Sequence, residues 1–241
     1  MSFMLAFSTM FSRNSNPCAT VSFERTMSCL NNQQRLKTFL QIGANDGITN
    51  DPVYPFLRNR GDWVGLQVEP TPRNFEKLKK LHGTRPHWSH YNGAIAPPSL
   101  CKDGLVDFWE RSESSDHWLE QGQANTVNPS GPHNKALSKV VRNCTSDLKW
   151  LIETHGSTKF QNLIKKQGLD LLQTDVECMD YDILRLADLG PESPYRPYHI
   201  HYESLSCMGD GVALARRYLR QHKYLCFPKG TNTFCSTLID V

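Results

Sequence analysis

Acidic side chains follow two of the apolar runs that the sequence predicts as strands. Asp175 and Glu177 come after residues 169–174, and Glu203 comes after residues 198–202. Residues two apart share a face of a continued strand, so the first two carboxylates would point the same way. Carboxylates at such a place can remove a proton from a hydroxyl group. The alternative for the pair is that one carboxylate caps the next helix and the other is solvated.

A turn with spaced glycines follows the first predicted strand. Residues 39–42 are mostly apolar and run directly into Gly43-Ala44-Asn45-Asp46-Gly47. In an α/β fold, a buried strand that stops at such a turn usually opens a nucleotide-like cofactor site. The glycines would let the backbone approach a ligand where a Cβ would obstruct it. Taken alone, this spacing also occurs at ordinary corners between a strand and a loop.

A second apolar run, residues 63–68, ends at Glu69. This glutamate follows Gly47 by about 20 residues, where a Rossmann-type site places the acid that binds the ribose hydroxyls. A glutamate at the end of a strand is otherwise usually a solvated charge. The combination of Glu69 with the glycine turn therefore favours a cofactor site at the carboxyl edge of a sheet.

The elements that must position these residues alternate along the chain. Apolar runs predict strands at residues 39–42, 63–68, 88–96, 104–109, 169–174, 198–202, 224–227 and 233–238. Amphipathic stretches predict helices between most of them. This alternation predicts an α/β fold with a mostly parallel sheet, helices on both faces and a closing antiparallel pair. Residues 110–138 lack a periodic pattern and are predicted to form a lid over the site or a flexible loop.

The composition is that of an ordinary globular chain. Its 241 residues suit one main domain, 35–241, preceded by residues 1–34 as an N-terminal arm or a transit segment. The net charge of +3 is mild, so no nucleic-acid partner is expected. A basic cluster is interpreted as a solvated helix face; it consists of Arg216, Arg217, Arg220 and Lys223. No apolar run reaches the roughly 18 residues of a spanning helix, so no transmembrane segment is expected.

The eight cysteines are scattered, and none form Cys-x-x-Cys. Zinc ribbons and redox pairs are therefore not indicated. In a chain of this size we interpret the cysteines as reduced thiols and expect an intracellular protein, cytoplasmic or organellar. Asn143-Cys144-Thr145 has the form of a glycosylation sequon, which would matter only in a secreted protein.

Several blocks of sequence occur in an order and at a spacing that match one family. They are residues 41–47, residues 65–70, Asn92-x-Ala94-Ile95, residues 170–177 and Tyr202-Glu203. Over roughly residues 36–227 the chain resembles the FkbM family of S-adenosylmethionine-dependent methyltransferases. The resemblance implies a Rossmann-like class I methyltransferase fold, in which a seven-stranded, mostly parallel sheet has an antiparallel last strand.

The resemblance also implies which residues bind the cofactor. The implied set is Gly43, Ala44, Asn45, Asp46, Gly47, Glu69, Asn92 and Gly93. Within it, the glycine turn would line the methionine part, and Asp46 would stand near the ammonium or the sulfonium. Glu69 would hold the ribose, and Asn92 with Gly93 would lie near the adenine.

The candidate catalytic residues are Asp175, Glu177 and Glu203. The resemblance implies that the first two face the transferred methyl group and the acceptor, and all three are candidates for the base. His199 and His201 are placed behind them, although such residues are more often satisfied within a sheet. No metal ligand is assigned, but a divalent metal held by Asp175 and Glu177 is an alternative way to polarise the acceptor hydroxyl.

The function expected from these features is methyl transfer from S-adenosylmethionine to a hydroxyl of a small molecule or a sugar. The family has glycine where this chain has Cys178, which leaves room for a non-catalytic scaffold that keeps the fold. We interpret Cys178 as a buried structural thiol rather than a nucleophile. An NAD-dependent oxidoreductase ranks last, because Gly-x-Gly-x-x-Gly is absent at the turn. The acceptor and the oligomeric state stay open.

Overall fold

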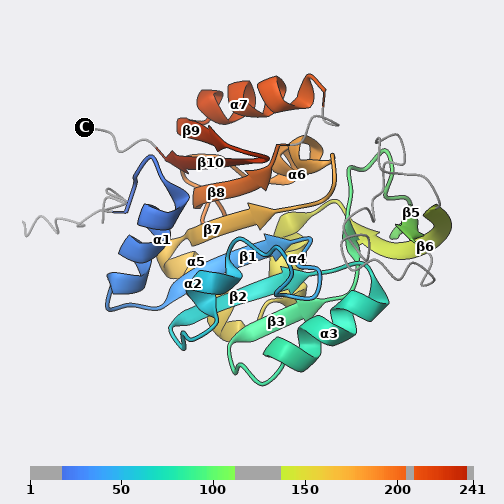
Figure 1. Cartoon of the computed structure of the whole chain (residues 1–241), viewed down its shortest axis with the longest axis horizontal. Helices are drawn as coiled ribbons and strands as arrows, with labels where there is room; N and C mark the ends of the chain where they lie inside the picture. The colour runs from blue at the N-terminus through green and yellow to red at the C-terminus, as the bar shows by residue number, and fades with distance from the viewer. Residues whose placement is uncertain (1–17, 112–136, 205–208, 238–241) are drawn as a thin grey trace, which may run out of the picture.

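A computed structural model of the chain describes residues 18–111, 137–204 and 209–237, and it has a seven-stranded sheet at its centre. The strand order is β3-β2-β1-β7-β8-β10-β9 (Figure 1). The bounds are Lys37–Ile42 (β1), Trp63–Val68 (β2), Trp88–Tyr91 (β3), Leu169–Thr174 (β7), Pro197–Glu203 (β8), Tyr224–Lys229 (β9) and Asn232–Thr237 (β10). β10 runs antiparallel to β8 and β9, whereas the other pairs of this sheet are parallel. The predicted fold class is therefore confirmed.

Continuous apolar runs form the central strands because both of their faces are covered. Every residue of β1, β2 and β7 is buried. Neighbouring side chains of β1 enter different cores: Phe39 packs in one, and Leu40 and Ile42 pack in the other. A single strand thus holds together the two layers of helices described next.

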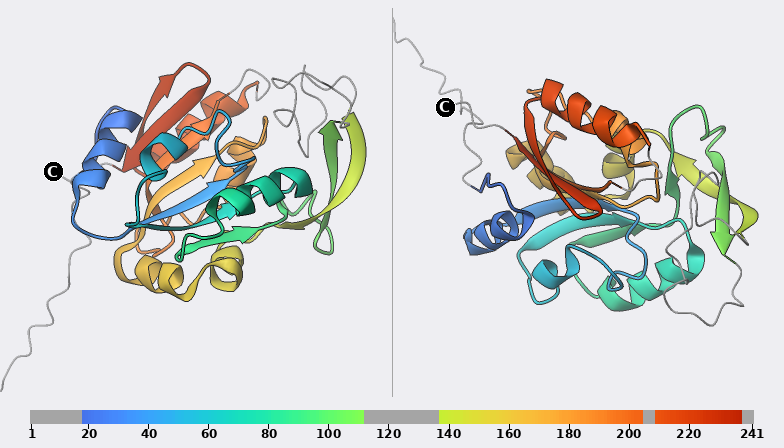
Figure 2. Two further views of the ribbon diagram at one scale, coloured as in Figure 1. Left: turned by 60° about the horizontal axis from the view of Figure 1, so that its bottom comes forward. Right: turned by 45° about the horizontal axis from the view of Figure 1, so that its top comes forward.

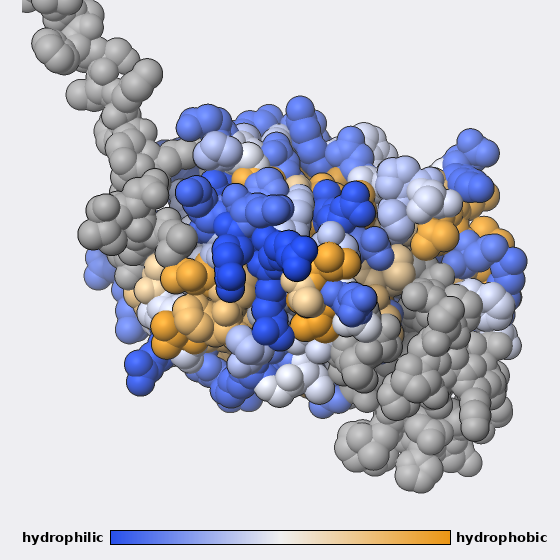
Figure 3. All heavy atoms as spheres, turned by 90° about the horizontal axis from the view of Figure 1, so that it is seen from above, coloured by the Kyte–Doolittle hydropathy of each residue, from blue (hydrophilic) through white to orange (hydrophobic). Residues whose placement is uncertain are grey.

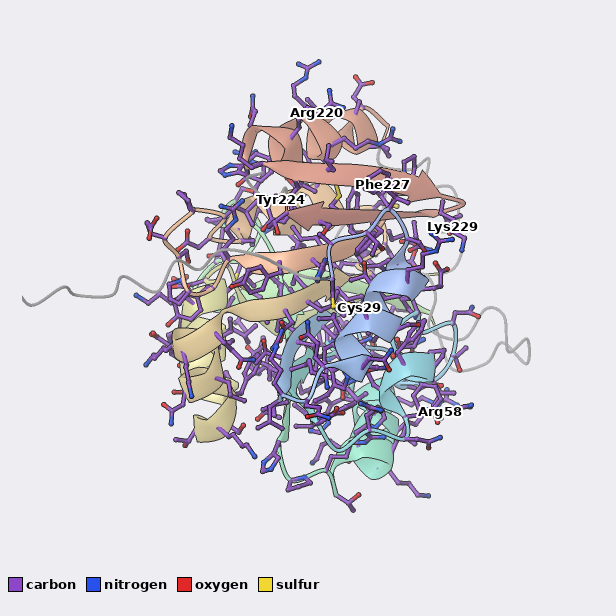
Figure 4. The ribbon with its side chains drawn as sticks, turned by 90° about the vertical axis from the view of Figure 1, so that its left-hand side faces the viewer. Cys29, Arg58, Arg220, Tyr224, Phe227 and Lys229 are labelled. Carbon is purple, nitrogen blue, oxygen red and sulfur yellow. A yellow bond between two sulfur atoms is a disulfide. The ribbon has the colours of Figure 1, made fainter. Side chains whose placement is uncertain are left out.

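Helices cover both faces of the sheet (Figures 1 and 2). One layer contains α1 (Phe23–Asn32), α2 (Tyr54–Leu57) and α3 (Pro72–His82). The other contains α4 (Leu148–His155), α5 (Thr158–Gln167), α6 (Asp180–Leu186) and α7 (Gly211–Gln221). Phe23, Met27 and Leu30 of α1 belong to the same core as Phe39 of β1, so this part of the predicted N-terminal arm packs on the sheet. Lys229 of β9 also pairs with Glu24 of α1 (Figure 4).

The predicted strand at residues 88–96 is divided in the structure. Its first part is β3, and its second part, β4 (Ala94–Ile95), pairs with β6 (Leu137–Thr145) in a separate sheet with β5 (Leu105–Arg111). Where the two parts separate, the Asn92 side-chain amide donates to the main-chain oxygen of Glu69, at 2.8 Å. Figure 1 shows the β5–β6 hairpin beyond the carboxyl ends of the parallel strands. The stretch predicted as a lid or loop lies almost entirely outside the described residues.

The cysteines that the structure describes are oxidised, so the prediction of reduced thiols is wrong. Disulfides join Cys18 to Cys29, Cys101 to Cys144, and Cys226 to Cys235, and Cys178 is also disulfide-bonded. The physical reason is tertiary: the Cα atoms of Cys101 and Cys144 lie 5.8 Å apart despite a sequence separation of 43. Spacing along the chain does not reveal such a pair. Disulfides persist mainly in oxidising compartments, so they do not support a cytoplasmic location.

The described helices and the surface around α7 bear on two of the expectations from the sequence. No helix among the described residues is long and apolar enough to span a bilayer. Hydrophilic residues run across the face that carries α7 (Figure 3), and Arg217, Arg220 and Lys223 are exposed there. The interpretation of the cluster as a solvated face agrees with the exposure of these three residues, whereas Arg216 is half-buried and its Nε is buried.

Candidate active site

The carboxyl ends of four parallel strands bring the predicted residues to one edge of the sheet. The glycine turn follows β1, Glu69 follows β2, Asp175 follows β7, and Glu203 ends β8. Main-chain hydrogen bonds tie these ends together: Asp175 N donates to Ile42 O at 2.9 Å, and Gly43 N donates to Val68 O at 3.0 Å. The edge is therefore a rigid frame rather than a set of independent loops.

Protein atoms leave no room for a Cβ at the glycines of the turn, whereas the sequence analysis explained these glycines by the approach of a ligand. Gly43 has φ +80°, and a Cβ there would lie 1.8 Å from Asp175 O. Gly47 has φ +79°, and its Cβ would lie 2.7 Å from Leu78 of α3. Both positions favour glycine for their backbone conformation and for space. The turn thus lies directly against the candidate catalytic segment.

Asp46 closes the turn on itself. Its carboxylate accepts from the main-chain nitrogens of Ile48 and Thr49, and from the Thr49 hydroxyl at 2.7 Å. Burial raises the pKa of Asp46, but the hydrogen bonds from Thr49 and Ile48 outweigh it and leave the pKa below its ordinary value. Asp46 therefore stabilises the loop after Gly47 through these hydrogen bonds, as a carboxylate.

Glu69 joins the loops that follow β1 and β2. One carboxylate oxygen accepts from Asn45 N and the other from Thr71 N, each at 2.8 Å. Burial raises the pKa of Glu69 to about 7. The Thr71 hydroxyl also donates to this carboxylate. A carboxylate can accept about four hydrogen bonds, so capacity remains for a ribose hydroxyl. Asn92 holds the Glu69 main chain, and a Cβ on Gly93 would lie 2.5 Å from the Tyr91 ring.

The three predicted acids form one group. Carboxylate oxygens of Asp175, Glu177 and Glu203 all lie within 4.8 Å of one another. β7 ends at Thr174, and Glu177 has φ +51°, so the two acids are not on a continued strand as the sequence suggested. The turn nevertheless brings their carboxylates together. We call these three residues the acid trio.

Mutual repulsion within the acid trio keeps protons bound. Burial and then the charge of Asp175 raise the pKa of Glu203 to about 10, and a hydrogen bond to Asp175 contributes. Burial and the charges of Asp180 and Glu177 raise the pKa of Asp175 well above its ordinary value. Like charges this close do not all ionise at neutral pH. We infer that the Asp175–Glu203 pair holds a proton at neutral pH, because burial and mutual repulsion raise the pKa of both carboxyls.

Cys178 follows the acid trio in an unusual backbone conformation. Its φ is +74°, which is rare for a residue with a side chain and explains why glycine suits this position. Because Cys178 is disulfide-bonded, it is neither the free thiol nor the nucleophile that the sequence left open.

Two acids near the site were not found from the sequence. Asp180, fully buried at the start of α6, accepts from the Thr174 hydroxyl at 2.5 Å and from Val176 N at 3.4 Å. Burial raises the pKa of Asp180 to about 6. Asp51 accepts from the Gln41 amide at 3.0 Å and caps the residues before α2. An acid in the first turn of a helix that directly follows a strand was the available signal for Asp180.

The two histidines of β8 lie in the core beneath α1 rather than in the site. The His201 ring packs 4.3 Å from the Phe23 ring, and His199 Nδ1 lies 3.0 Å from the Ser236 hydroxyl. Burial lowers the pKa of His199 to about 3 and that of His201 to about 4, so both are neutral near pH 7. Both lie within the sheet rather than in the site, which was the alternative that the sequence favoured, but only His199 has a hydrogen-bond partner there, because His201 Nδ1 is buried without one among the described residues.

Comparisons with known proteins place the chain in a family. The model of the methyltransferase FkbM domain matches residues 41–226. No curated protein matches the chain. Among solved structures, the METTL16 methyltransferase domain has a TM-score of 0.41 and 11% identity, with 92% of this chain and 70% of that chain covered. Fibrillarin from Aeropyrum pernix with bound S-adenosyl-L-methionine has a TM-score of 0.42 and 11% identity, with coverages of 89% and 74%. At these scores the two structures carry no inference about activity. The family match covers most of the chain, which therefore belongs to the methyltransferase FkbM domain family.

Proposed function

We propose that this protein transfers a methyl group from S-adenosylmethionine to a hydroxyl of a small molecule or a sugar. The observation that carries the proposal is the acid trio, whose carboxylates lie within 4.8 Å of one another at the strand edge that bears the glycine turn. A donor held at the turn and a base beside it is the arrangement that methyl transfer to a hydroxyl needs. Membership of a methyltransferase family supports the same reaction.

The residues at the edge suit the proposed cofactor. The turn at residues 43–47 would hold its methionine part, Glu69 its ribose, and Asn92 with Gly93 its adenine. The fit is supported by Glu69, a buried carboxyl that retains acceptor capacity between the loops. When bound, the cofactor supplies an electrophilic sulfonium methyl group. The protein's task is then to align the acceptor oxygen and to remove its proton.

Asp175 is the best candidate for the base. The hydrogen bond between the two carboxyls lowers the pKa of Asp175 and raises that of Glu203, so Asp175 is the acceptor within the pair. Because the pKa of Asp175 is raised, its carboxylate is a stronger base than an ordinary aspartate. The acceptor hydroxyl would give its proton to an Asp175 oxygen as its oxygen takes the methyl group, and the bond from the methyl group to the cofactor sulfur would break with the electron pair left on sulfur. The charge of Glu177 contributes to the raised pKa of Asp175.

A divalent cation is the alternative occupant of the acid trio. Three carboxylate oxygens form a hard ligand set of the kind that Mg²⁺, Mn²⁺ or Ca²⁺ prefers. Such a cation would relieve the repulsion that now raises the pKa values of Asp175 and Glu203. If it takes part, turnover depends on added magnesium and is lost with a chelator. If the protonated trio is the working form, a chelator leaves turnover unchanged.

The test is formation of S-adenosylhomocysteine with a panel of hydroxyl acceptors, including sugars and RNA. Asp175→Asn is expected to lower kcat by about 10²–10⁴-fold, the contribution of a positioned base, with little change in cofactor affinity. Glu76→Gln, on the exposed face of α3, is the matched control and is expected to behave as wild type. Full turnover by Asp175→Asn would remove Asp175 from the role of base.

A non-catalytic scaffold is the second candidate, and Cys178 favours it. Cys178 stands where the family has glycine, next to Asp175 and Glu177. It has φ +74° and is disulfide-bonded. A scaffold would bind the cofactor yet form no S-adenosylhomocysteine with any acceptor of the panel.

A further inference from the structure

The only sequon of the chain lies on an exposed strand. Asn143-Cys144-Thr145 has the form Asn-x-Thr, whereas Asn128-Pro129-Ser130 is excluded because proline occupies its middle position. Asn143 belongs to β6 and pairs in register with Leu105 of β5. Its side chain is exposed, while the neighbouring Cys144 is buried in the small core under the hairpin. This alternation presents the Asn143 amide to solvent.

The disulfides supply the condition that a sequon needs. N-glycosylation takes place in the oxidising lumen of the secretory pathway, where disulfides also form. Cys144, the middle residue of the sequon, is itself bonded to Cys101. The disulfide of the residue next to Asn143 requires an oxidising environment, and the compartment in which N-glycosylation occurs is oxidising.

An apolar surface surrounds Asn143. Leu105, its partner across the hairpin, is 48% exposed, and Val141, two residues away on the same face, is 56% exposed. Orange residues beside blue ones mark this right-hand part of the molecule in Figure 3. The first sugar of a glycan on Asn143 would cover these side chains, because the apolar faces of its ring can pack on them.

We propose that Asn143 carries an N-linked glycan and that the protein matures in the secretory pathway. The donor is an oligosaccharide on a lipid diphosphate, and the catalyst is a membrane-bound oligosaccharide transferase. A bond forms between Asn143 Nδ2 and C1 of the first sugar as the bond from C1 to the diphosphate oxygen breaks. The lipid diphosphate leaves with the electron pair, and the amide loses one proton to the transferase.

The test is peptide mapping of Asn143 by mass spectrometry in the chain isolated from its own cells. The expected result is a glycan on the Asn143 peptide that peptide-N-glycosidase removes, with conversion of Asn143 to aspartate, in molecules whose cysteines are oxidised. Unmodified Asn143 in those molecules would overturn the proposal. Cysteines found as free thiols would overturn it as well, because the lumenal compartment would then be wrong.

Variants directed into the secretory pathway of animal cells test the site itself. Asn143→Gln is expected to abolish the glycosidase-sensitive shift in gel mobility, and Thr145→Ser is expected to keep it. Asn59→Gln, an exposed asparagine outside any sequon, is the matched control and is expected to shift as wild type does. A wild-type chain that leaves the cell without the shift would contradict the proposal, whatever its methyltransferase activity.

Discussion

The raised pKa of Glu203 in the acid trio makes the stability of the folded protein depend on pH. Glu203 has an ordinary pKa of 4.5 and a pKa of about 10 in the folded chain. Folding between these pH values must take up a proton. The stabilising contribution of the protonated carboxyl is therefore full below about pH 4.5 and is lost as the pH rises toward 10. Such a cost is typical of groups that are kept for function.

Glu203→Gln is expected to stabilise the protein at pH 8. Glutamine resembles the protonated carboxyl and pays no cost for proton uptake. A gain of about 1 kcal/mol or more corresponds to a rise in Tm of at least about 2–4 °C for a chain of this size. The gain is expected to vanish near pH 4.5. Thermal unfolding of wild type, Glu203→Gln and the control Glu76→Gln at both pH values checks this, and a Tm at pH 8 no higher than wild type would contradict it.

Glu69→Ala is expected to destabilise the fold as well as the cofactor site. It leaves Asn45 N and Thr71 N without their carboxylate partners, at a cost of about 1–3 kcal/mol for each buried group. Urea unfolding measures the loss, with Glu76→Ala as the exposed control. An unchanged unfolding midpoint would show that the two nitrogens find other partners.

At the scale of elements, the close approach of the segments that follow the parallel neighbours β1 and β7 sets the shape of the site. Gly43 is confined by Asp175 O, so Gly43→Ala forces apart the turn and the segment that bears the acid trio. We expect a loss of about 3 kcal/mol or more, because the new Cβ meets backbone at a positive φ. Gly61→Ala is the matched control, since nothing lies within 4 Å of its Cβ. Comparable urea midpoints for the two variants would contradict this account.

The sequence predicted those elements whose burial is local and continuous. β1, β2 and β7 appear as apolar runs because both faces are covered, and the sequence located each of them. The division of the strand at residues 88–96 was not predictable, because it coincides with a tertiary contact of Asn92 with Glu69. The role of Asp180 was not predictable for the same reason. It depends on hydrogen bonds from Thr174 and Val176, which form only once the turn after β7 has folded.

At the scale of the whole molecule, two disulfides hold parts of the chain that lie outside the central sheet, and Cys226–Cys235 joins its strands β9 and β10. Cys101–Cys144 ties the hairpin to the segment after β4, and Cys18–Cys29 ties the start of the described chain to α1. These pairings arise from tertiary proximity, so residue spacing alone did not indicate them. The chain is therefore better suited to an oxidising compartment than its composition suggested.

Removal of the Cys101–Cys144 disulfide is expected to lower stability by about 2–4 kcal/mol, because the crosslink restricts a long loop in the unfolded chain. The double variant Cys101→Ala, Cys144→Ala should show this loss in denaturant unfolding under oxidising conditions. A reductant should lower the midpoint of the wild type further, since it opens the other bridges too. Equal stability of the oxidised double variant and the oxidised wild type would contradict a stabilising role for this bridge.

Calorimetric titration of the purified protein with S-adenosylmethionine tests the central claim most directly. S-adenosylhomocysteine is the matched ligand and NADH the control. The account predicts saturable binding of the first two and none of NADH, with affinity retained in Asp175→Asn and lost in Glu69→Ala molecules that remain folded. Absence of binding by the folded wild type, or binding of NADH alone, would contradict the proposed methyl transfer.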